Sequence, residues 1–313
     1  MTTANFLNPL NSTKLIFMDR FFNEMIELYN SNKFPKVLLL NGKKGVGKFT
    51  LVLHFLNYIF TKNEIKPYNL KDKIINTESL FYNQLLSQTN QDVLFIKAEE
   101  NKNIKIEDIR NLKSILSRTS LSNNPRFVVI DEIEFVNENS MNALLKPLEE
   151  PSNNNFFILI NNQQADLIKT ISSRCLKSNI FLNSQEKKMI INYLLENNNI
   201  EDLIGFNSNL TPGLFLQFNE IYLKLNVNSN DKILSKITKF LNQYKKNKSK
   251  ILISLTLYSI DQYFFKLVQS NEEKLDLLLS LKNDINKNIN DFIYFNLNIN
   301  SVLNSIEVKL NNV

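Results

Sequence analysis

The stretch Leu38–Thr50, which reads LLLNGKKGVGKFT, decides the fold of the first half of the chain. A short apolar run leads into a glycine-rich turn, and an apolar helical pattern follows directly. Three of the five glycines of the protein, Gly42, Gly45 and Gly47, lie in this turn. Glycine lets backbone N–H groups point inward around a phosphate, and the dipole of the following helix attracts the same negative charge. The pattern predicts a phosphate-binding loop between a strand and a helix.

The residues that follow the last glycine decide what this loop can do. Lys48 is expected to reach the β- and γ-phosphates of a nucleotide. The full pattern, G-x-x-x-x-G-K-[ST], then requires a Ser or Thr whose hydroxyl ligates Mg²⁺. Phe49 occupies that position, and Thr50 lies one residue later, about 100° further round the helix. The sequence leaves open whether ATP and Mg²⁺ bind, and it predicts that hydrolysis at this site is weak or absent.

A second apolar run, Phe127–Ile130, ends in the acidic pair Asp131 and Glu132. Beside a phosphate loop, an Asp in this place holds Mg²⁺ and the Glu orients the attacking water. The alternative interpretation is a pair of solvated acids at the end of a strand. The phosphate loop upstream favours the first interpretation.

Further apolar runs complete a layered pattern. Val37–Leu40 and Phe156–Ile160 are continuous apolar runs, and Val93–Ile96 is a fourth candidate strand. Continuous runs are typical of strands buried on both faces, as in a parallel sheet. Helical patterns separate the runs, at residues 50–60, 106–117 and 140–148. Strand alternating with helix predicts an α/β domain over residues 1–180, a parallel sheet with helices on both faces.

The pattern changes after residue 180, where amphipathic helices replace the apolar runs. The helices are expected at residues 185–197, 212–225, 231–245, 250–270, 272–295 and 301–310. We expect the first two to form a small helical lid over residues 181–228. The remaining helices are expected to form an all-α domain over residues 229–313.

Composition excludes several classes of protein. The formal charge of +6 and the pI of about 9.1 are compatible with a nucleic-acid partner, but a chain rich in Lys, Asn and Ile acquires them from composition alone. One Cys and one His exclude an internal disulfide and a zinc site built from several of these residues. Residues 1–11 lack a signal-peptide pattern, and the apolar run near 251–260 is too short to span a bilayer. We therefore expect a soluble, cytoplasmic protein without a membrane partner.

Residues 131–151 read DEIEFVNENSMNALLKPLEEP. This stretch resembles the signature of the bacterial DNA polymerase III clamp-loader family of AAA+ proteins, in which an acidic box leads into an NALLK-x-LEEP helix. Asn162 resembles the polar sensor-1 residue of that family. Thr170–Cys175, which reads TISSRC, is similar to its SRC motif, whose Arg reaches across to the ATP of a neighbouring subunit. The resemblance thus implies an arginine finger at Arg174, a role that suits a fixed guanidinium.

Three residues bear on the branch of this family. Phe49 is typical of a subunit that does not hydrolyse ATP, and Gly213 stands where the ATPase subunit carries its sensor-2 Arg. Arg174 is kept, whereas delta subunits typically lack that finger. Together they favour the delta-prime branch, which assists ATP-dependent loading of the β sliding clamp onto primer–template DNA. The resemblance implies a hetero-oligomeric ring with gamma/tau and delta subunits, held by residues 229–313 as a collar.

Some features leave alternatives open. The intact pair Asp131–Glu132 fits a gamma/tau-type ATPase of the same complex, or another AAA+ ATPase acting on DNA. Thr61–Asn90 contains no Cys where many relatives carry a zinc module, so no zinc is expected. The lysines of Lys239–Lys250 form either a direct DNA grip or a solvated face. The residues expected to contact nucleotide are Gly42, Gly45, Gly47, Lys48, Thr50, Asp131 and Asn162, with Glu132 and Arg174 as candidate catalytic groups.

Overall fold

The computed structural model describes residues 8–98, 103–117, 124–152, 154–205, 209–270 and 274–311. The chain divides into two compact units. Unit 1 comprises Met1–Glu201 and Phe206–Gln217, and unit 2 comprises Asp202–Gly205 and Phe218–Val313. The phosphate loop and the acidic pair both lie in unit 1.

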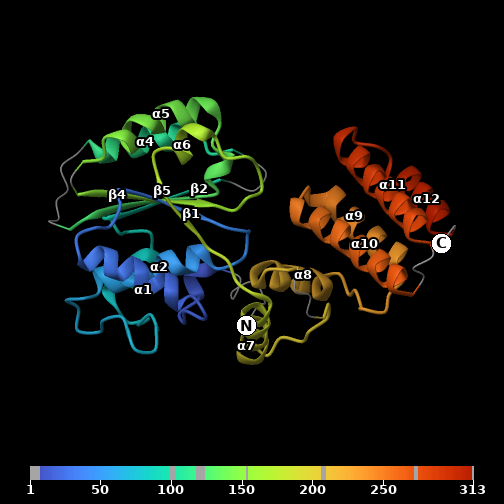
Figure 1. Ribbon diagram of the computed structural model, residues 1–313, viewed down its shortest axis with the longest axis horizontal. Coiled ribbons are helices and arrows are strands. Elements are labelled where there is room, and N and C mark those ends of the chain that lie inside the picture. The colour runs from blue at the N-terminus through green and yellow to red at the C-terminus, as the bar shows by residue number, and fades with distance from the viewer. Residues whose placement is uncertain are drawn as a thin grey trace. The chain divides into compact units, whose positions relative to one another are not determined.

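Unit 1 is built on a five-stranded parallel sheet in the order β2-β3-β4-β1-β5 (Figure 1). The strands are β1 (Val37–Asn41), β2 (Val93–Lys97), β3 (Arg126–Asp131), β4 (Asn155–Asn161) and β5 (Leu176–Asn179). The four predicted strands are confirmed, each longer by one residue at one or both ends. The α/β fold class predicted from the continuous apolar runs is therefore confirmed.

Helices cover both faces of this sheet. Unit 1 contains the helices α1 (Asp19–Asn30), α2 (Lys48–Phe60), α3 (Leu80–Leu86), α4 (Ile106–Leu116), α5 (Glu138–Glu149), α6 (Lys169–Ser172) and α7 (Ser184–Asn198), with the 3₁₀ turns η2 (Pro9–Asn11) and η3 (Ile133–Phe135). Successive residues of a strand face opposite layers. Phe127 and Val129 of β3 join the core formed with α1 and α2, whereas Val128 and Ile130 join the core formed with α4 and α5. Figure 1 shows α1 and α2 on one side of the sheet and α4 to α6 on the other.

Two elements of unit 1 do not follow from the strand pattern. Strand β5 has the polar sequence LKSN and is largely exposed, because it lies at the sheet edge beyond β1. Helix α1 carries four buried residues at helical spacing, Phe21, Phe22, Met25 and Ile26. That pattern is visible in the sequence, so α1 is predictable, whereas β5 is defined by its pairing with β1.

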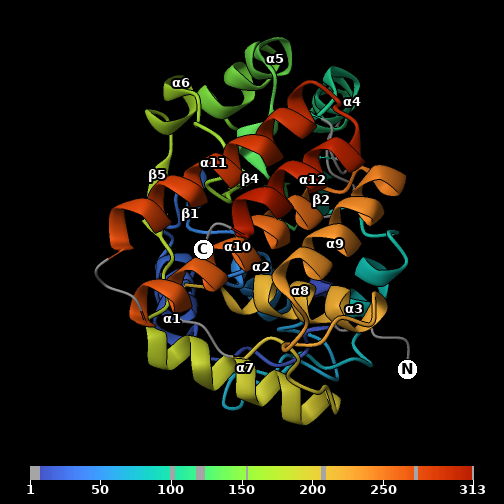
Figure 2. The same cartoon turned by 90° about the vertical axis from the view of Figure 1, so that its right-hand side faces the viewer.

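Unit 2 contains a bundle of four helices, α9 (Ile233–Asn247), α10 (Lys250–Ser270), α11 (Leu275–Tyr294) and α12 (Ile299–Leu310). Helix α10 packs on α9 and α11, and α12 packs on α9 and α11 (Figure 2). Fully buried aliphatic side chains, including Ile237, Leu241, Ile285 and Ile306, form the core. Helix α8 (Pro212–Lys224) begins in unit 1 and ends in unit 2. The predicted all-α C-terminal region is confirmed.

Helix α10 is apolar enough, over its 21 residues, to meet a length-and-composition test for a membrane span. Its buried side chains Leu252, Ile260 and Phe264 lie in the helical core of unit 2. Packing inside the bundle buries 39% of the apolar window, and core helices of globular proteins meet the same test.

His54 lies fully buried in α2. Its Nε2–H donates to the backbone carbonyl of Ser12 at 2.9 Å, and its Nδ1 accepts from the Tyr68 hydroxyl at 2.9 Å. Burial lowers the pKa of His54 to about 4, although the bond to Ser12 acts in the opposite direction. The folded protein therefore holds a neutral imidazole that links α2 to the N-terminal segment and to the loop after α2.

We expect the free energy of unfolding to fall as the pH drops from 6.5 to 4. The unfolded chain binds a proton at an ordinary histidine pKa of about 6.5, whereas folded His54 does so only near pH 4. Denaturant unfolding at pH 7 and pH 4.5 should show a fall about 2 kcal/mol smaller in His54→Gln than in the wild type. Equal falls in both proteins would contradict the buried neutral histidine.

Candidate functional site

The phosphate loop joins the end of β1 to the start of α2. Gly45 and Gly47 adopt φ angles of +83° and +99°, which residues with a Cβ rarely adopt. Gly47 is the N-cap residue of α2, and its carbonyl accepts the N–H of Leu51. The glycines thus let the chain turn sharply and aim the N-terminus of α2 at the loop.

Lys48 is buried inside this loop, with only 3% of its surface exposed. Its ammonium donates to the carbonyl oxygen of Gly42 at 2.6 Å and to that of Lys43 at 2.9 Å. Burial lowers the pKa of Lys48 to about 8, although the charges of Asp131 and Glu134 act in the opposite direction. A buried ammonium held only by neutral carbonyls gains from an anionic partner.

A cavity of about 400 Å³ opens beside the loop, lined by residues of unit 1. One wall is polar and comprises Lys44–Thr50 with Lys97, Asp131, Glu132 and Asn162. Apolar residues form another part of its wall, among them Leu15, Ile16, Met18, Ile190, Tyr193 and Leu194. A cavity of this size with one polar and one apolar wall suits a small ligand that carries both an apolar and an anionic part.

The predicted nucleotide residues gather at this cavity, although they come from distant parts of the chain. Gly45, Gly47, Lys48, Thr50, Asp131, Glu132 and Asn162 line it, and the Gly42 carbonyl holds the Lys48 ammonium. They meet because β1, β3 and β4 are neighbours and their carboxyl ends share one edge of the parallel sheet. The Nδ2 of Asn162 donates to the Oδ1 of Asp131 at 3.2 Å.

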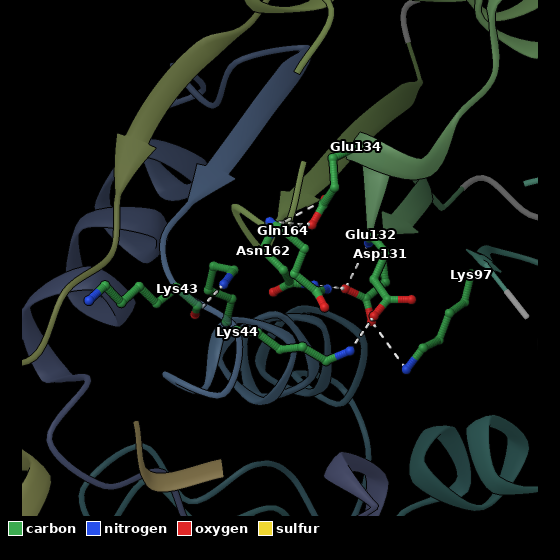
Figure 3. A network of polar contacts seen from close by, with 9 residues as sticks. Lys43, Lys44, Lys97, Asp131, Glu132, Glu134, Asn162 and Gln164 are labelled. Carbon is green, nitrogen blue, oxygen red and sulfur yellow. Dashed lines mark hydrogen bonds and ion pairs between the residues drawn. The ribbon is translucent and has the colours of Figure 1, made fainter. Parts of the chain in front are cut away.

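Two lysines that the sequence does not single out lie against the acidic pair. The Lys44 ammonium is 2.8 Å from the Oε1 of Glu132, and the Lys97 ammonium is 3.5 Å from the Oδ2 of Asp131 (Figure 3). Lys44 belongs to the phosphate loop, whereas Lys97 ends β2, directly in register with Asp131. The pairing of Lys97 depends on the order of strands, which the sequence alone does not give.

Glu134 is hydrogen-bonded to the turn that follows β4, next to the acidic pair. Its side chain is buried and accepts from the backbone N–H groups of Asn162 at 3.0 Å and Gln164 at 3.4 Å (Figure 3). Burial raises the pKa of Glu134, against the lowering effect of these hydrogen bonds. Glu134 thereby fixes the turn after β4 and orients Asn162.

The residues present do not fit a magnesium site of the ordinary phosphate-loop type. Phe49 offers no oxygen, and its ring packs on that of Phe95, with 5.6 Å between centroids. Asp131 and Glu132 are engaged by Lys97 and Lys44.

The start of α8 lies against the phosphate loop, and Pro212, Gly213 and Leu214 line the same cavity. The Thr211 hydroxyl donates to the carbonyl of Lys44 at 2.6 Å, and the N–H of Gly213 donates to that of Gly45 at 2.9 Å. A Cβ on Gly213 would lie 2.7 Å from the Cα of Gly45. Glycine at position 213 is therefore required for close contact between two backbones, and a side chain that reaches a phosphate is absent there.

Arg174 lies elsewhere, in the turn between α6 and β5, and does not line the cavity. Its Nε donates to the Oε1 of Glu149 at 2.7 Å, and its Nη1 donates to the carbonyl of Thr170 at 2.8 Å. About a third of its side-chain surface is exposed. The structure therefore separates Arg174 from the other predicted site residues.

Residues 18–183 match the family described as DNA polymerase III, delta subunit. This match covers more than half of the chain. The chain belongs to this family. The matched region includes the phosphate loop, the acidic pair and Arg174, so the predicted family membership is confirmed.

Relatives with curated names agree with this assignment. The chain is 30% identical over 148 residues to DNA polymerase III subunit delta' of Pseudomonas aeruginosa, which covers 44% of the chain and 41% of the relative. It is 25% identical over 266 residues to the subunit of the same name in Bacillus subtilis, covering 82% and 74%. The chain spans about half the length of the first curated relatives, 41% to 60% for four of them.

Among solved structures, the chain is similar to a DNA polymerase III, gamma subunit-related protein from Thermotoga maritima. The TM-score is 0.47 at 18% identity, and the match covers 92% of this chain and 95% of that one.

We expect Gly213→Ala to lower the stability of unit 1. A Gly→Ala change inside a helix ordinarily stabilises by about 0.5–1 kcal/mol. Here the new Cβ would meet the backbone of Gly45, so the change should cost about 1–3 kcal/mol instead. Thermal unfolding measures the sign, with Gln217→Ala in the same helix as the control. A variant as stable as the wild type would contradict the close contact.

Proposed function

We propose that this chain acts as the delta-prime subunit of a bacterial clamp loader. Such a subunit assists ATP-dependent loading of the β sliding clamp onto primed DNA in replication. One observation carries the proposal, namely a nucleotide-type cavity with Phe49 at the magnesium position, in a chain that keeps Arg174 outside that cavity. The curated relatives named subunit delta' support the same assignment.

The cavity supports binding of a nucleoside triphosphate such as ATP. Its polar wall offers the glycine loop, the Lys48 ammonium and the N-terminus of α2 to the phosphates. Its apolar wall offers Tyr193 and Leu194 to a base. Glycines 42, 45 and 47 with Lys48, Thr50, Asp131 and Asn162 are the proposed contacts.

The same cavity argues against efficient hydrolysis by this chain. Glu132, which would orient the attacking water, is engaged by Lys44 at 2.8 Å. Phe49 supplies no ligand for a metal, and Gly213 supplies no cation for the γ-phosphate. We propose that nucleotide at this site is bound and not turned over.

Arg174 is proposed to act on the ATP of a neighbouring subunit. Its guanidinium is partly exposed and lies away from the cavity of its own chain. Glu149 holds it by an ion pair, which keeps it ordered before a neighbour binds. A preorganised guanidinium can stabilise the charge that develops on a transferred phosphoryl group.

The proposed partners are the gamma/tau ATPase and delta subunits, with the β clamp and primer–template DNA engaged through the complex. Residues 181–228 are proposed as the lid and residues 229–313 as the collar that holds a hetero-oligomeric ring. The proposed location is the cytoplasm, in line with the DNA polymerase III relatives.

A gamma/tau-type ATPase is the alternative, and one observation favours it. Asp131 and Glu132 are both present and both line the cavity, as a hydrolysing subunit requires. The two proposals differ in whether the isolated chain hydrolyses ATP: a gamma/tau-type subunit does, and the proposed delta-prime subunit does not.

We expect the purified chain to release no phosphate from ATP above background in the presence of Mg²⁺, because Phe49 supplies no hydroxyl ligand for the metal and Glu132, paired with Lys44, is not a free base. A phosphate-release assay measures this, with Lys48→Ala as the control. Steady turnover that Lys48→Ala abolishes would favour the gamma/tau-type ATPase.

In a reconstituted loader, Arg174→Ala should lower the clamp- and DNA-stimulated ATPase rate, because one neighbouring site loses its transition-state charge partner. The loss at that site should be roughly 100-fold or more. Lys169→Ala, which removes an exposed charge from α6, should leave the rate unchanged. Size-exclusion chromatography checks that both variants assemble. An unchanged rate in assembled Arg174→Ala complexes would rule out the finger role.

A further inference from the structure

Lys44 and Lys97 form ion pairs with the two carboxylates that line the cavity, and the two lysines come from different segments of the chain. Lys44 reaches Glu132 from the phosphate loop, and Lys97 reaches Asp131 from the end of β2. Figure 3 shows both ammonium groups directed at the same pair of carboxylates. The carboxylates of Asp131 and Glu132 are less than a tenth exposed, whereas the side chains of Lys44 and Lys97 are 38% and 59% exposed.

The two ammonium groups carry together the same charge as one magnesium ion. In an ordinary phosphate-loop site, Mg²⁺ lies between the acidic strand and the phosphates and is balanced by the acidic pair. Here the acidic pair is balanced by two lysines. The three lysines Lys44, Lys48 and Lys97 and the two carboxylates together carry a net charge of +1. An Mg²⁺ ion with Lys48 and the same two carboxylates would also carry +1.

The loop that carries Lys44 is also fixed in position. The Thr211 hydroxyl donates a hydrogen bond to the carbonyl of Lys44, and the Gly213 N–H donates one to the carbonyl of Gly45. The Lys44 side chain therefore starts from a backbone that is hydrogen-bonded to the start of α8, and Lys44 lines the cavity. A cation presented from a fixed backbone costs less entropy to hold beside a ligand than one on a free loop.

We propose that Lys44 and Lys97 replace Mg²⁺ at this site, so that a nucleoside triphosphate binds here without a divalent cation. The inference rests on the proposed nucleotide site and deepens it, since it names the ionic form of the ligand as the metal-free nucleotide. Phe49 fits this arrangement, because a hydroxyl ligand has no role where no metal binds. The nucleotide then serves as a structural ligand of unit 1.

Calorimetry with ATP tests the proposal on the full chain, in buffer with EDTA and in buffer with excess Mg²⁺. We expect dissociation constants that agree within about twofold between the two buffers. A site that uses Mg²⁺ would lose most of its affinity in EDTA, since the metal bridges the β- and γ-phosphates.

Two pairs of substitutions separate a specific role from a general effect of charge. The double variant Lys44→Ala with Lys97→Ala should weaken ATP binding in EDTA by roughly tenfold or more, because two charge-assisted contacts are lost. The control pair is Lys177→Ala with Lys188→Ala, which removes two exposed lysines of unit 1 that do not line the cavity. It should change the affinity by less than about twofold. If the double variant of Lys44 and Lys97 does not fold, the single variant Lys97→Gln replaces it in the same measurement, because the Lys97 side chain is largely exposed.

The outcomes distinguish failure of metal-free recognition from failure of the proposed nucleotide site. Binding in both buffers that falls with the Lys44 and Lys97 variants supports metal-free recognition. Binding only with Mg²⁺ overturns the inference and leaves the nucleotide site standing. Equal affinity in both buffers that the variants do not change overturns the role of the two lysines. Absence of ATP binding in both buffers overturns the nucleotide site and the inference with it, while the Arg174 role is judged separately by the partner's ATPase rate.

Discussion

Burial of β1, β3 and β4 on both faces constrains where every polar group of unit 1 can lie. Because their side chains alternate between two apolar layers, these strands carry polar side chains only at their ends, and the carboxyl ends bear Asn41, Asp131 and Asn161. The strands are parallel and adjacent, so those ends meet along one edge. The phosphate loop, the acidic pair and Asn162 are neighbours for this reason, and no local sequence signal would bring them together.

The sequence predicts the parts of this arrangement that depend on local pattern. Continuous apolar runs identify β1 to β4, and the glycine-rich turn identifies the phosphate loop, because each requires particular residues at fixed spacing. Strand β5 is not predicted from the sequence, because an edge strand with the sequence LKSN shows no hydrophobic periodicity. The family assignment follows from the motif at residues 131–151, which is long and specific.

The rest depends on contacts between distant segments. Lys97 meets Asp131 only because β2 pairs with β3 in that register, and an exposed lysine at a strand end carries no signal of its own. Gly213 looks like a missing arginine in the sequence, whereas in the fold it is a position where two backbones touch. Glu149 and Arg174 lie in two separate motifs, and the ion pair between them follows from the fold.

The contact between Gly45 and Gly213 has a consequence for how this sequence can change over generations. The chain has only five glycines, and its composition favours lysine, asparagine and isoleucine. A Cβ on Gly213 would meet the backbone of Gly45, and a Cβ on Gly45 would meet the Thr211 hydroxyl and the backbone of Leu214 and Gly213. The same close contact therefore restricts both positions to glycine.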